Sequence, residues 1–169
     1  MRRNFLALFA IVFLCAGCTH ENVSGYKLFT PYIGRTVPLN REMILSKEGR
    51  NMWSPANVPR LRVSYVLLET NTELLASDQF IANLPIGTPV TLTSVRDEII
   101  ADGSNLIAYG TTQIPDSNRE VKFAYCWGTV RNINAAPWEP TNTPTFRKPD
   151  WPVESHGTIP FYHPVRDRP

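Results

Sequence analysis

"GTPVTLTSVRDEII", residues 87–100, decides the fold of this chain because its apolar and polar residues alternate. Val90 and Leu92 keep a period of two, and the period then slips at Val95. A period of two is typical of a strand with one buried face, and a slip in that period indicates a bulge or a bend. Residues 87–100 are therefore predicted to form a long strand with an irregularity near its middle.

Two more strands are predicted directly after this one. LIAYGTTQI (106–114) follows the dipeptide Asp102-Gly103, which favours a tight hairpin turn. REVKFAYCWGTV (119–130) follows PDSN (115–118), a run of residues that favour turns. One face of this third strand carries four apolar side chains: Val121, Phe123, Tyr125 and Trp127. Three consecutive strands with short connections predict an antiparallel meander.

The segment before the meander also has β character. RTVPLNREMILS (35–46) contains a proline, which cannot donate to a ladder and so indicates an edge strand. RLRVSYVLLE (60–69) alternates like a half-buried strand, and KEGRNMWSPANVP (47–59) is predicted to be the loop before it. TELLASDQFIANL (72–84) fits either a helical turn or a short strand. The chain is therefore predicted to be all-β, a small barrel or sandwich.

Residues 137–169 have a different composition from the rest of the chain. They hold eight of the 15 prolines. So many prolines exclude a helix or a central strand. The segment is either a flexible tail or a strap packed on the sheet by its aromatic side chains. Trp138 and Trp151 favour partial docking, because a plain linker rarely contains two tryptophans.

The first 17 residues have the order of an export signal. Arg2 and Arg3 give a positive start, and residues 5–14 form an unbroken apolar run. This run is shorter than the roughly 20 residues of a membrane-spanning helix and fits the apolar part of a signal peptide. Small residues, Ala16 and Gly17, then stand where a peptidase needs them. One interpretation is an ordinary secretory signal that is cut near Gly17.

The end of this segment, LCAGC, resembles the lipobox of bacterial lipoproteins, with Cys15 at the position where that motif usually has leucine. The resemblance implies that Cys18 receives a diacylglyceryl group and further acylation such as palmitate, and becomes the new N-terminus. Two or more acyl chains anchor a protein firmly to a membrane. In Gram-negative lipoproteins an aspartate after the cysteine tends to retain the protein at the inner membrane. Thr19 stands there instead, so the resemblance implies the outer membrane, with the domain facing the periplasm.

A second resemblance concerns IANLPIGTPVTLTSV, residues 81–95. This stretch resembles part of the bacterial SH3-like domains, in which a turn such as Gly87-Thr88 leads into an alternating strand. Such domains are small barrels in cell-envelope proteins, and they often bind peptidoglycan or peptides. The expected organisation is a signal peptide at 1–17, a tether at 18–30, a β-rich and SH3-like domain at 31–136, and a proline-rich tail or strap at 137–169. Fold alone does not establish a ligand.

Charge argues against one class of partner. The full chain has 17 basic and 15 acidic residues, and two of the basic ones, Arg2 and Arg3, precede the predicted cleavage site. The mature chain would therefore be close to neutral, with no basic run. Binding to nucleic acid depends on neutralising phosphates with basic side chains. We therefore expect no nucleic-acid partner.

Cys126 would be the only free thiol of a lipidated mature chain, so no intramolecular disulfide is expected. It is interpreted as a buried small apolar residue, which is the commoner case, as a reactive thiol, or as an intermolecular bridge. A cysteine hydrolase would pair Cys126 with His156 or His163 as the base. A catalytic cysteine usually begins a helix, whereas Cys126 falls inside a predicted strand. We therefore expect no enzyme.

The remaining candidates for metal or acid–base chemistry are few. The three histidines, of which His20 is the first, lack the spacing of metal ligands, and neither a metal nor a cofactor is expected. The acidic pairs Asp97-Glu98 and Glu69 with Glu73 are expected to be solvated rather than catalytic. Nothing in the pattern of residues isolates one of these carboxylates in an apolar pocket.

Aromatic side chains are the best candidates for binding. Trp53, Trp138 and Trp151 would make a platform for a glycan or a peptide if they lie on the surface, and they would cap the core if they do not. We expect a non-enzymatic envelope lipoprotein that binds a protein or peptidoglycan partner. Two alternatives stay open, a periplasmic inhibitor or immunity protein against a toxin or lysozyme, and a structural component of an envelope or secretion complex.

Overall fold

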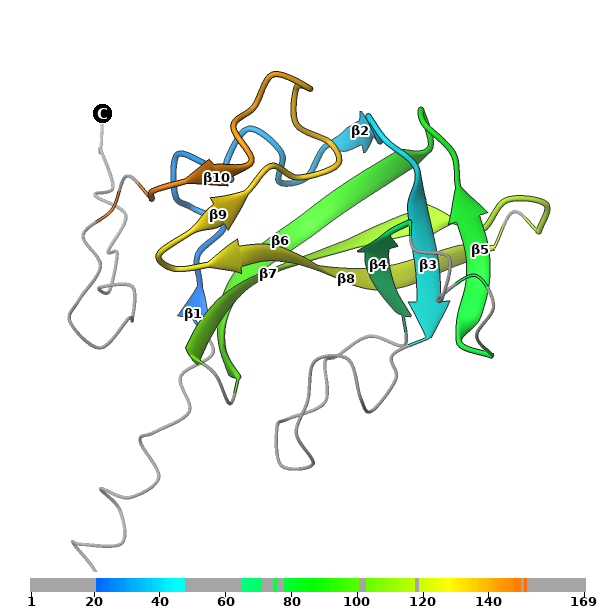
Figure 1. Ribbon diagram of the computed structural model, residues 1–169, viewed down its shortest axis with the longest axis horizontal. Coiled ribbons are helices and arrows are strands. Elements are labelled where there is room, and N and C mark those ends of the chain that lie inside the picture. The colour runs from blue at the N-terminus through cyan, green and yellow to red at the C-terminus, as the bar shows by residue number, and fades with distance from the viewer. Residues whose placement is uncertain are drawn as a thin grey trace, which may run out of the picture.

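The computed structural model describes residues 21–47, 65–70, 75, 78–100, 103–117, 119–149 and 151, and these residues form a β-sheet with irregular connections (Figure 1). The strands are β1 (Glu21–Asn22), β2 (Thr36–Pro38), β3 (Met43–Lys47), β4 (Tyr65–Glu69), β5 (Phe80–Leu84), β6 (Pro89–Ile100), β7 (Gly103–Gln113), β8 (Glu120–Thr129), β9 (Ile133–Asn134) and β10 (Phe146–Arg147). The predicted all-β class is confirmed. Among the described residues no helix is long and apolar enough to cross a membrane.

The meander of β6, β7 and β8 is the centre of the sheet, as the alternation of residues predicted. β6 pairs antiparallel with β7, and β7 pairs antiparallel with β8. The ladder between β6 and β7 shifts its register between Leu92 and Ser94, which confirms the irregularity inferred from the slip in period. The predicted turn after β7 is present at 115–117, where Asp116 has a φ of 67°. The predicted turn at Asp102 lies outside the described residues.

The other strands extend the sheet on both sides. The order along the sheet is β1-β6-β7-β8-β4-β3-β5, with β2 also paired to β6. β4 runs parallel to β8, whereas β3 pairs antiparallel with both β4 and β5. β5 resolves the ambiguous segment 72–84 in part, because residues 80–84 form a strand. The pairing of the described strands leaves the sheet open, with β5 at one edge, so the SH3-like barrel stays a prediction.

Both ends of the described chain are part of the fold, which makes the folded unit longer than the predicted 31–136. The tether prediction is wrong for residues 21–30, since β1 pairs with β6 and Val23 and Phe29 are fully buried. The backbone N–H of Val23 donates a hydrogen bond to the carbonyl of Val95, at 2.9 Å. At the other end, Trp138 and Trp151 pack in the same core. Because both segments are mostly polar, their sequences did not indicate that a few buried apolar side chains hold each of them on the sheet.

The two faces of the sheet carry different amounts of apolar surface. One face holds the main core, and all four apolar residues predicted on one face of β8 belong to it. The opposite face has a smaller cluster in which Tyr109 and Ile107 of β7 meet side chains of β4 and β8, with Cys126 packed against it. Period-two alternation places the two sets of side chains on opposite faces. The sheet therefore contributes to two apolar clusters rather than one.

The connection from β8 to β9 depends on Gly128. This residue has a φ of 131°, and a Cβ atom built on it would lie 2.3 Å from the carbonyl oxygen of Asn132. Glycine adopts this backbone conformation without a steric penalty. The close approach lets the chain fold back so that Ile133 pairs with Gly128 and the C-terminal segment returns over the sheet.

Candidate functional site: the C-terminal strap

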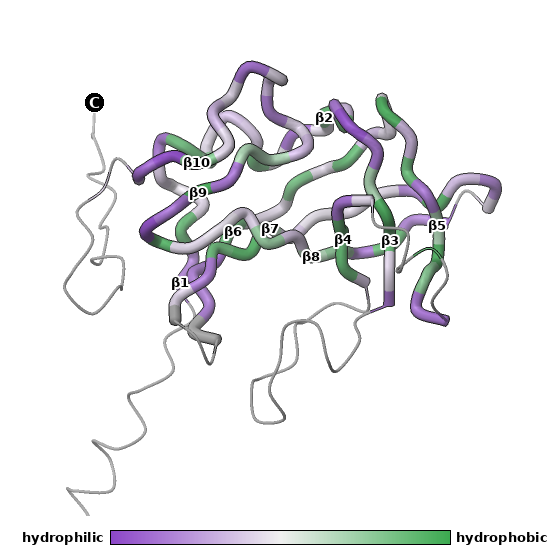
Figure 2. Tube along the Cα trace, in the orientation of Figure 1, coloured by the Kyte–Doolittle hydropathy of each residue, from purple (hydrophilic) through white to green (hydrophobic). Residues whose placement is uncertain are grey.

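The strap, defined here as residues 135–149 with residue 151, is the part of the chain that contains two predicted site residues, Trp138 and Trp151. It follows β9 and includes β10, and the two strands pair antiparallel with Phe146 opposite Asn134. Figure 2 shows that the strap is mostly hydrophilic, whereas apolar positions concentrate in the strands of the sheet. Its attachment must therefore depend on polar contacts as well as on its tryptophans.

A buried ion pair closes the strap on itself. Glu139 is only 2% exposed, and both of its carboxylate oxygens accept hydrogen bonds from Nη2 of Arg147, at 2.8 and 2.6 Å. One of them, Oε2, also accepts the backbone N–H of Ala136 at 2.7 Å. Nη2 of Arg147 further donates to the carbonyl of Asn134 at 3.1 Å. The pair therefore joins the start of the strap, its end and β9 at one point.

Asn40 and Arg41, between β2 and β3, attach the strap to the sheet. The backbone N–H of Asn40 donates to the carbonyl of Pro137 at 2.6 Å, and its side-chain amide donates to the carbonyl of Glu139. Nη2 of Arg41 donates to the carbonyl of Ala135 at 2.7 Å. These bonds satisfy carbonyl groups that the proline-rich backbone cannot pair within itself, because it forms no regular ladder there.

The tryptophans of the strap lie in an aromatic cluster, not on a rim. Trp138 is 5% exposed, and its ring centroid lies 5.2 Å from that of Trp127, at an angle of 89°. Trp151 is 6% exposed and packs against Tyr26 at 4.9 Å. Edge-to-face contacts of this kind stabilise aromatic pairs beyond the area that they bury. Neither Trp138 nor Trp151 therefore exposes a ring that could form the predicted ligand platform. Trp53, the third predicted residue of that platform, lies outside the described residues.

Burial under the strap also changes how two tyrosines ionise. Burial raises the pKa of Tyr125 to about 12, and the nearby Arg41 offsets only part of this effect. Burial, followed by the negative charge of Glu139, also raises the pKa of Tyr32. Both phenols are therefore neutral at physiological pH, and neither supplies a base or a nucleophile.

The buried interior of this region offers hydrogen-bond donors rather than catalytic groups. The indole N–H groups of Trp127, Trp138 and Trp151 have no hydrogen-bond partner, and the same holds for Nε of Arg41 and of Arg147. The carboxylate of Glu139 is engaged in its ion pair.

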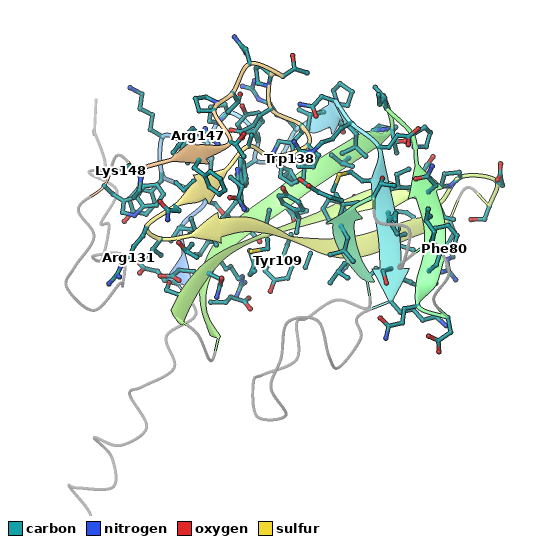
Figure 3. All side chains as sticks on the ribbon, in the orientation of Figure 1. Phe80, Tyr109, Arg131, Trp138, Arg147 and Lys148 are labelled. Carbon is teal, nitrogen blue, oxygen red and sulfur yellow. The ribbon has the colours of Figure 1, made fainter. Side chains whose placement is uncertain are left out.

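The outer edge of the strap, unlike its interior, exposes an aromatic side chain and a cation to solvent. Phe146 is 71% exposed, more than either of the other large apolar side chains that stand out from the described surface, Leu75 and Ile86. Arg147 follows it and is held in the ion pair, and Lys148 is exposed. Figure 3 shows Arg147 and Lys148 along the same edge of the molecule. The residues TFRKP (145–149) were not predicted as a site, and an aromatic residue beside two cations was the available signal.

Cys126 does not have the surroundings of a nucleophile. It is half-buried on the face of the sheet opposite the main core, and burial raises the pKa of its thiol. Its Sγ lies 3.7 Å from the carbonyl oxygen of Gly128. His156 and His163, its predicted partners in the hydrolase interpretation, lie outside the described residues, as does His20.

The acidic pair Asp97-Glu98 is buried, so the prediction that it is solvated is wrong. Asp97 accepts a hydrogen bond from the hydroxyl of Ser104, and Glu98 accepts one from the hydroxyl of Tyr109. Glu69 is exposed, and Glu73 lies outside the described residues. Within the described ranges, no three histidine, cysteine or acidic side chains are grouped so that they could hold a metal ion.

Comparison with known proteins does not extend these observations. No protein family, no curated protein and no solved structure matches this chain.

Proposed function

We propose that this chain is a non-enzymatic lipoprotein of the bacterial cell envelope, anchored through Cys18 and acting by binding a protein or cell-wall partner. The positive start, the short apolar run and the small residues before Cys18 support the anchor. A folded β-sheet that begins at Glu21 supports a compact body directly after it.

The observation that carries the binding proposal is the exposure of Phe146 on a rigidly held edge strand. An aromatic side chain that is 71% exposed contributes apolar surface to solvent unless a partner covers it. The neighbouring Arg147 is fixed by Glu139, so the backbone of β10 is positioned before any partner arrives. Aromatic residues are enriched in protein interfaces, and a binding surface that is ordered in advance loses less conformational entropy when the partner binds. We therefore place the binding surface around Phe146.

The anchor is tested by metabolic labelling with a clickable fatty acid. The wild-type protein is expected to carry the label and to fractionate with the outer membrane, whereas Cys18→Ala is expected to carry none. An unlabelled wild-type protein that fractionates like Cys18→Ala would remove the anchor from the proposal.

The binding surface is tested by crosslinking the lipidated protein in its native membrane and identifying what it captures. Phe146→Ala is expected to lose most of the capture, and Ile86→Ala is the matched control because Ile86 is also exposed, at 66%, but lies before β6 rather than on the strap. Recovery of glycan strands supports a wall-binding protein. Recovery of one toxin or lysozyme would select an inhibitor, and recovery of a large complex would select a structural component. Capture that Phe146→Ala leaves unchanged would contradict the proposed surface.

A further inference from the structure

One row of paired residues crosses six strands and relates the N-terminus to the strap. The row runs through Glu21, Asp97, Leu106, Gly128, Ile133 and Arg147. Each neighbour in it is a backbone partner of the next, from β1 through β6, β7, β8 and β9 to β10. The N-terminal strand and the C-terminal strap are therefore at the same level of the sheet, although they are far apart in sequence.

The directions of the strands show what lies beyond this row. β1 is antiparallel to β6, with Asn22 opposite Arg96, so the N-terminal end of β1 points to the side of the row on which Glu98 lies. Thr129 lies on that side too, because it pairs with Asn105, which in turn pairs with Glu98. We call this side the anchor end of the sheet.

Two exposed cations belong to the anchor end. Arg131 lies in the turn in which the backbones of Thr129 and Asn132 bond to each other, and Lys148 directly follows Arg147 of the row. Figure 3 shows Arg131 and Lys148 on one side of the molecule, the side on which β1 lies in Figure 1. The carboxylates of Asp97 and Glu98 at this end are buried and accept hydrogen bonds, and Glu21 is half-buried, so Arg131 and Lys148 are the exposed charges among these described neighbours.

The distance from the anchor to this end is short. Cys18 precedes Glu21 by three residues, and a chain spans at most about 3.5 Å per residue, so the two Cα atoms are within about 11 Å of each other. The polar headgroup layer on each side of a bilayer is itself about 5–8 Å thick. An acylated Cys18 at the edge of the hydrocarbon would therefore hold β1 close to the headgroup layer.

We infer that the anchor end of the sheet lies on the bilayer, with Arg131 and Lys148 against anionic phospholipid headgroups. This inference rests on the proposed lipid anchor at Cys18. A lysine or arginine close to an anionic membrane strengthens attachment about fivefold. The acyl chains already attach the protein firmly to the membrane, so the two cations set the orientation of the folded domain rather than the strength of its attachment. The turn at 115–117, at the far end of β7 and β8, then points away from the membrane.

The test uses the full-length lipidated protein, purified from membranes and reconstituted into vesicles of phosphatidylcholine with or without phosphatidylglycerol. A fluorophore is attached at Asn132→Cys on the anchor end, and in a second variant at Ser117→Cys on the distal turn, both in a Cys126→Ala background. Quenching by brominated lipids then reports the distance from the bilayer. The Asn132→Cys label is expected to be quenched at least fivefold more than the Ser117→Cys label in vesicles containing phosphatidylglycerol.

Replacing both Arg131 and Lys148 by glutamine is expected to reduce this contrast to the level seen in phosphatidylcholine alone. Equal quenching at the two positions in a protein that carries its acyl chains would overturn the orientation while leaving the anchor intact. Absence of fatty-acid labelling in the cell would instead overturn the anchor, so the two failures are distinguishable. A midpoint temperature of thermal unfolding equal to that of the wild-type protein verifies, for each labelled variant, that the sheet is intact.

Discussion

The meander and the strap are both fixed in this fold, but different forces fix them. The meander has long ladders on both sides of β7 and apolar side chains on both of its faces. The strap has one ladder of two residue pairs, and it depends on the Glu139–Arg147 ion pair, on Asn40 and on two tryptophans. Backbone ladders tolerate many substitutions on the solvent face, whereas a buried ion pair fails when either partner is lost. The strap is therefore the more fragile region, and apart from residues 136–139 and Trp151 it is also less deeply buried than the meander.

The largest expected effect of a single substitution is that of Glu139→Ala. It leaves Arg147 without its partner and removes the acceptor of the Ala136 N–H group, so the free energy of unfolding is expected to fall by about 3 kcal/mol. Urea denaturation measures this. Glu69→Ala is the matched control, since Glu69 also pairs with an arginine, Arg41 at 3.0 Å, but its side chain is 69% exposed. The control is expected to cost less than 1 kcal/mol. Equal losses would contradict the distinction between a buried and a solvated pair.

High pH is expected to weaken the contact between the strap and the meander through Tyr125. Burial raises the pKa of Tyr125 from 10 to about 12 in the folded protein, so between these values the unfolded chain ionises first. Stability is therefore fully present below pH 10 and falls as the pH rises toward 12, by roughly 2–3 kcal/mol in total.

This loss is measured by comparing the wild-type protein with Tyr125→Phe in urea at pH 10 and pH 11. The wild-type protein is expected to lose about 1 kcal/mol more than the variant over this interval. Identical pH dependence in the two proteins would show that Tyr125 ionises as freely in the folded state as in the unfolded chain.

Within the meander, the expected sensitive position is Gly110. A Cβ atom there would lie 2.6 Å from the carbonyl oxygen of Thr91 and 2.8 Å from the ring of Phe123, so Gly110→Ala is expected to cost about 1–3 kcal/mol. Gly25→Ala is the control, because nothing lies within 4 Å of the position of its added Cβ. Thermal unfolding of both variants measures the difference. A neutral Gly110→Ala would mean that β6 and β7 separate more easily than their ladder indicates.

The smallest effect concerns reactivity rather than stability. Burial raises the pKa of the Cys126 thiol, and the thiolate is the form that reacts. Alkylation by iodoacetamide at pH 8 is therefore expected to be slower in the folded protein than in urea. A folded protein that reacts as fast as the unfolded chain would place Cys126 on an accessible surface and reopen its interpretation as a functional thiol.

The sequence predicted the meander well because its signals are local. Alternation in residues 119–130 assigned the faces of β8 correctly, and the slip at Val95 indicated the register shift beside Ser94. The turn at 115–118 was read from its residue types alone. Each of these features depends on neighbours within a few positions, which a sequence displays directly.

The strap and the N-terminal strand were harder to predict because non-local contacts determine them. Glu139 and Arg147 are eight residues apart in a proline-rich stretch, and no periodicity indicates that they pair. Val23 is buried by residues more than 70 positions away, including Val95. Trp138 and Trp151 were candidates because exposed rings would make a platform for a ligand, but the alternative, that they cap the core, agrees with their burial. For Phe146, the exposed aromatic residue, the only signal in the sequence was the pair of cations, Arg147 and Lys148, that directly follows it.

The central claim is that the strap and the meander form one cooperative unit, and hydrogen exchange at the backbone amide of Ala136 tests it most directly. That N–H group donates to Oε2 of Glu139 and to no sheet ladder, so its exchange reports the strap alone. We predict that its opening free energy equals the free energy of global unfolding measured in urea on the same protein. The claim would be contradicted if the Ala136 amide exchanged through an opening whose free energy is several kcal/mol below that of global unfolding, while the amides of β7 and β8 stay protected.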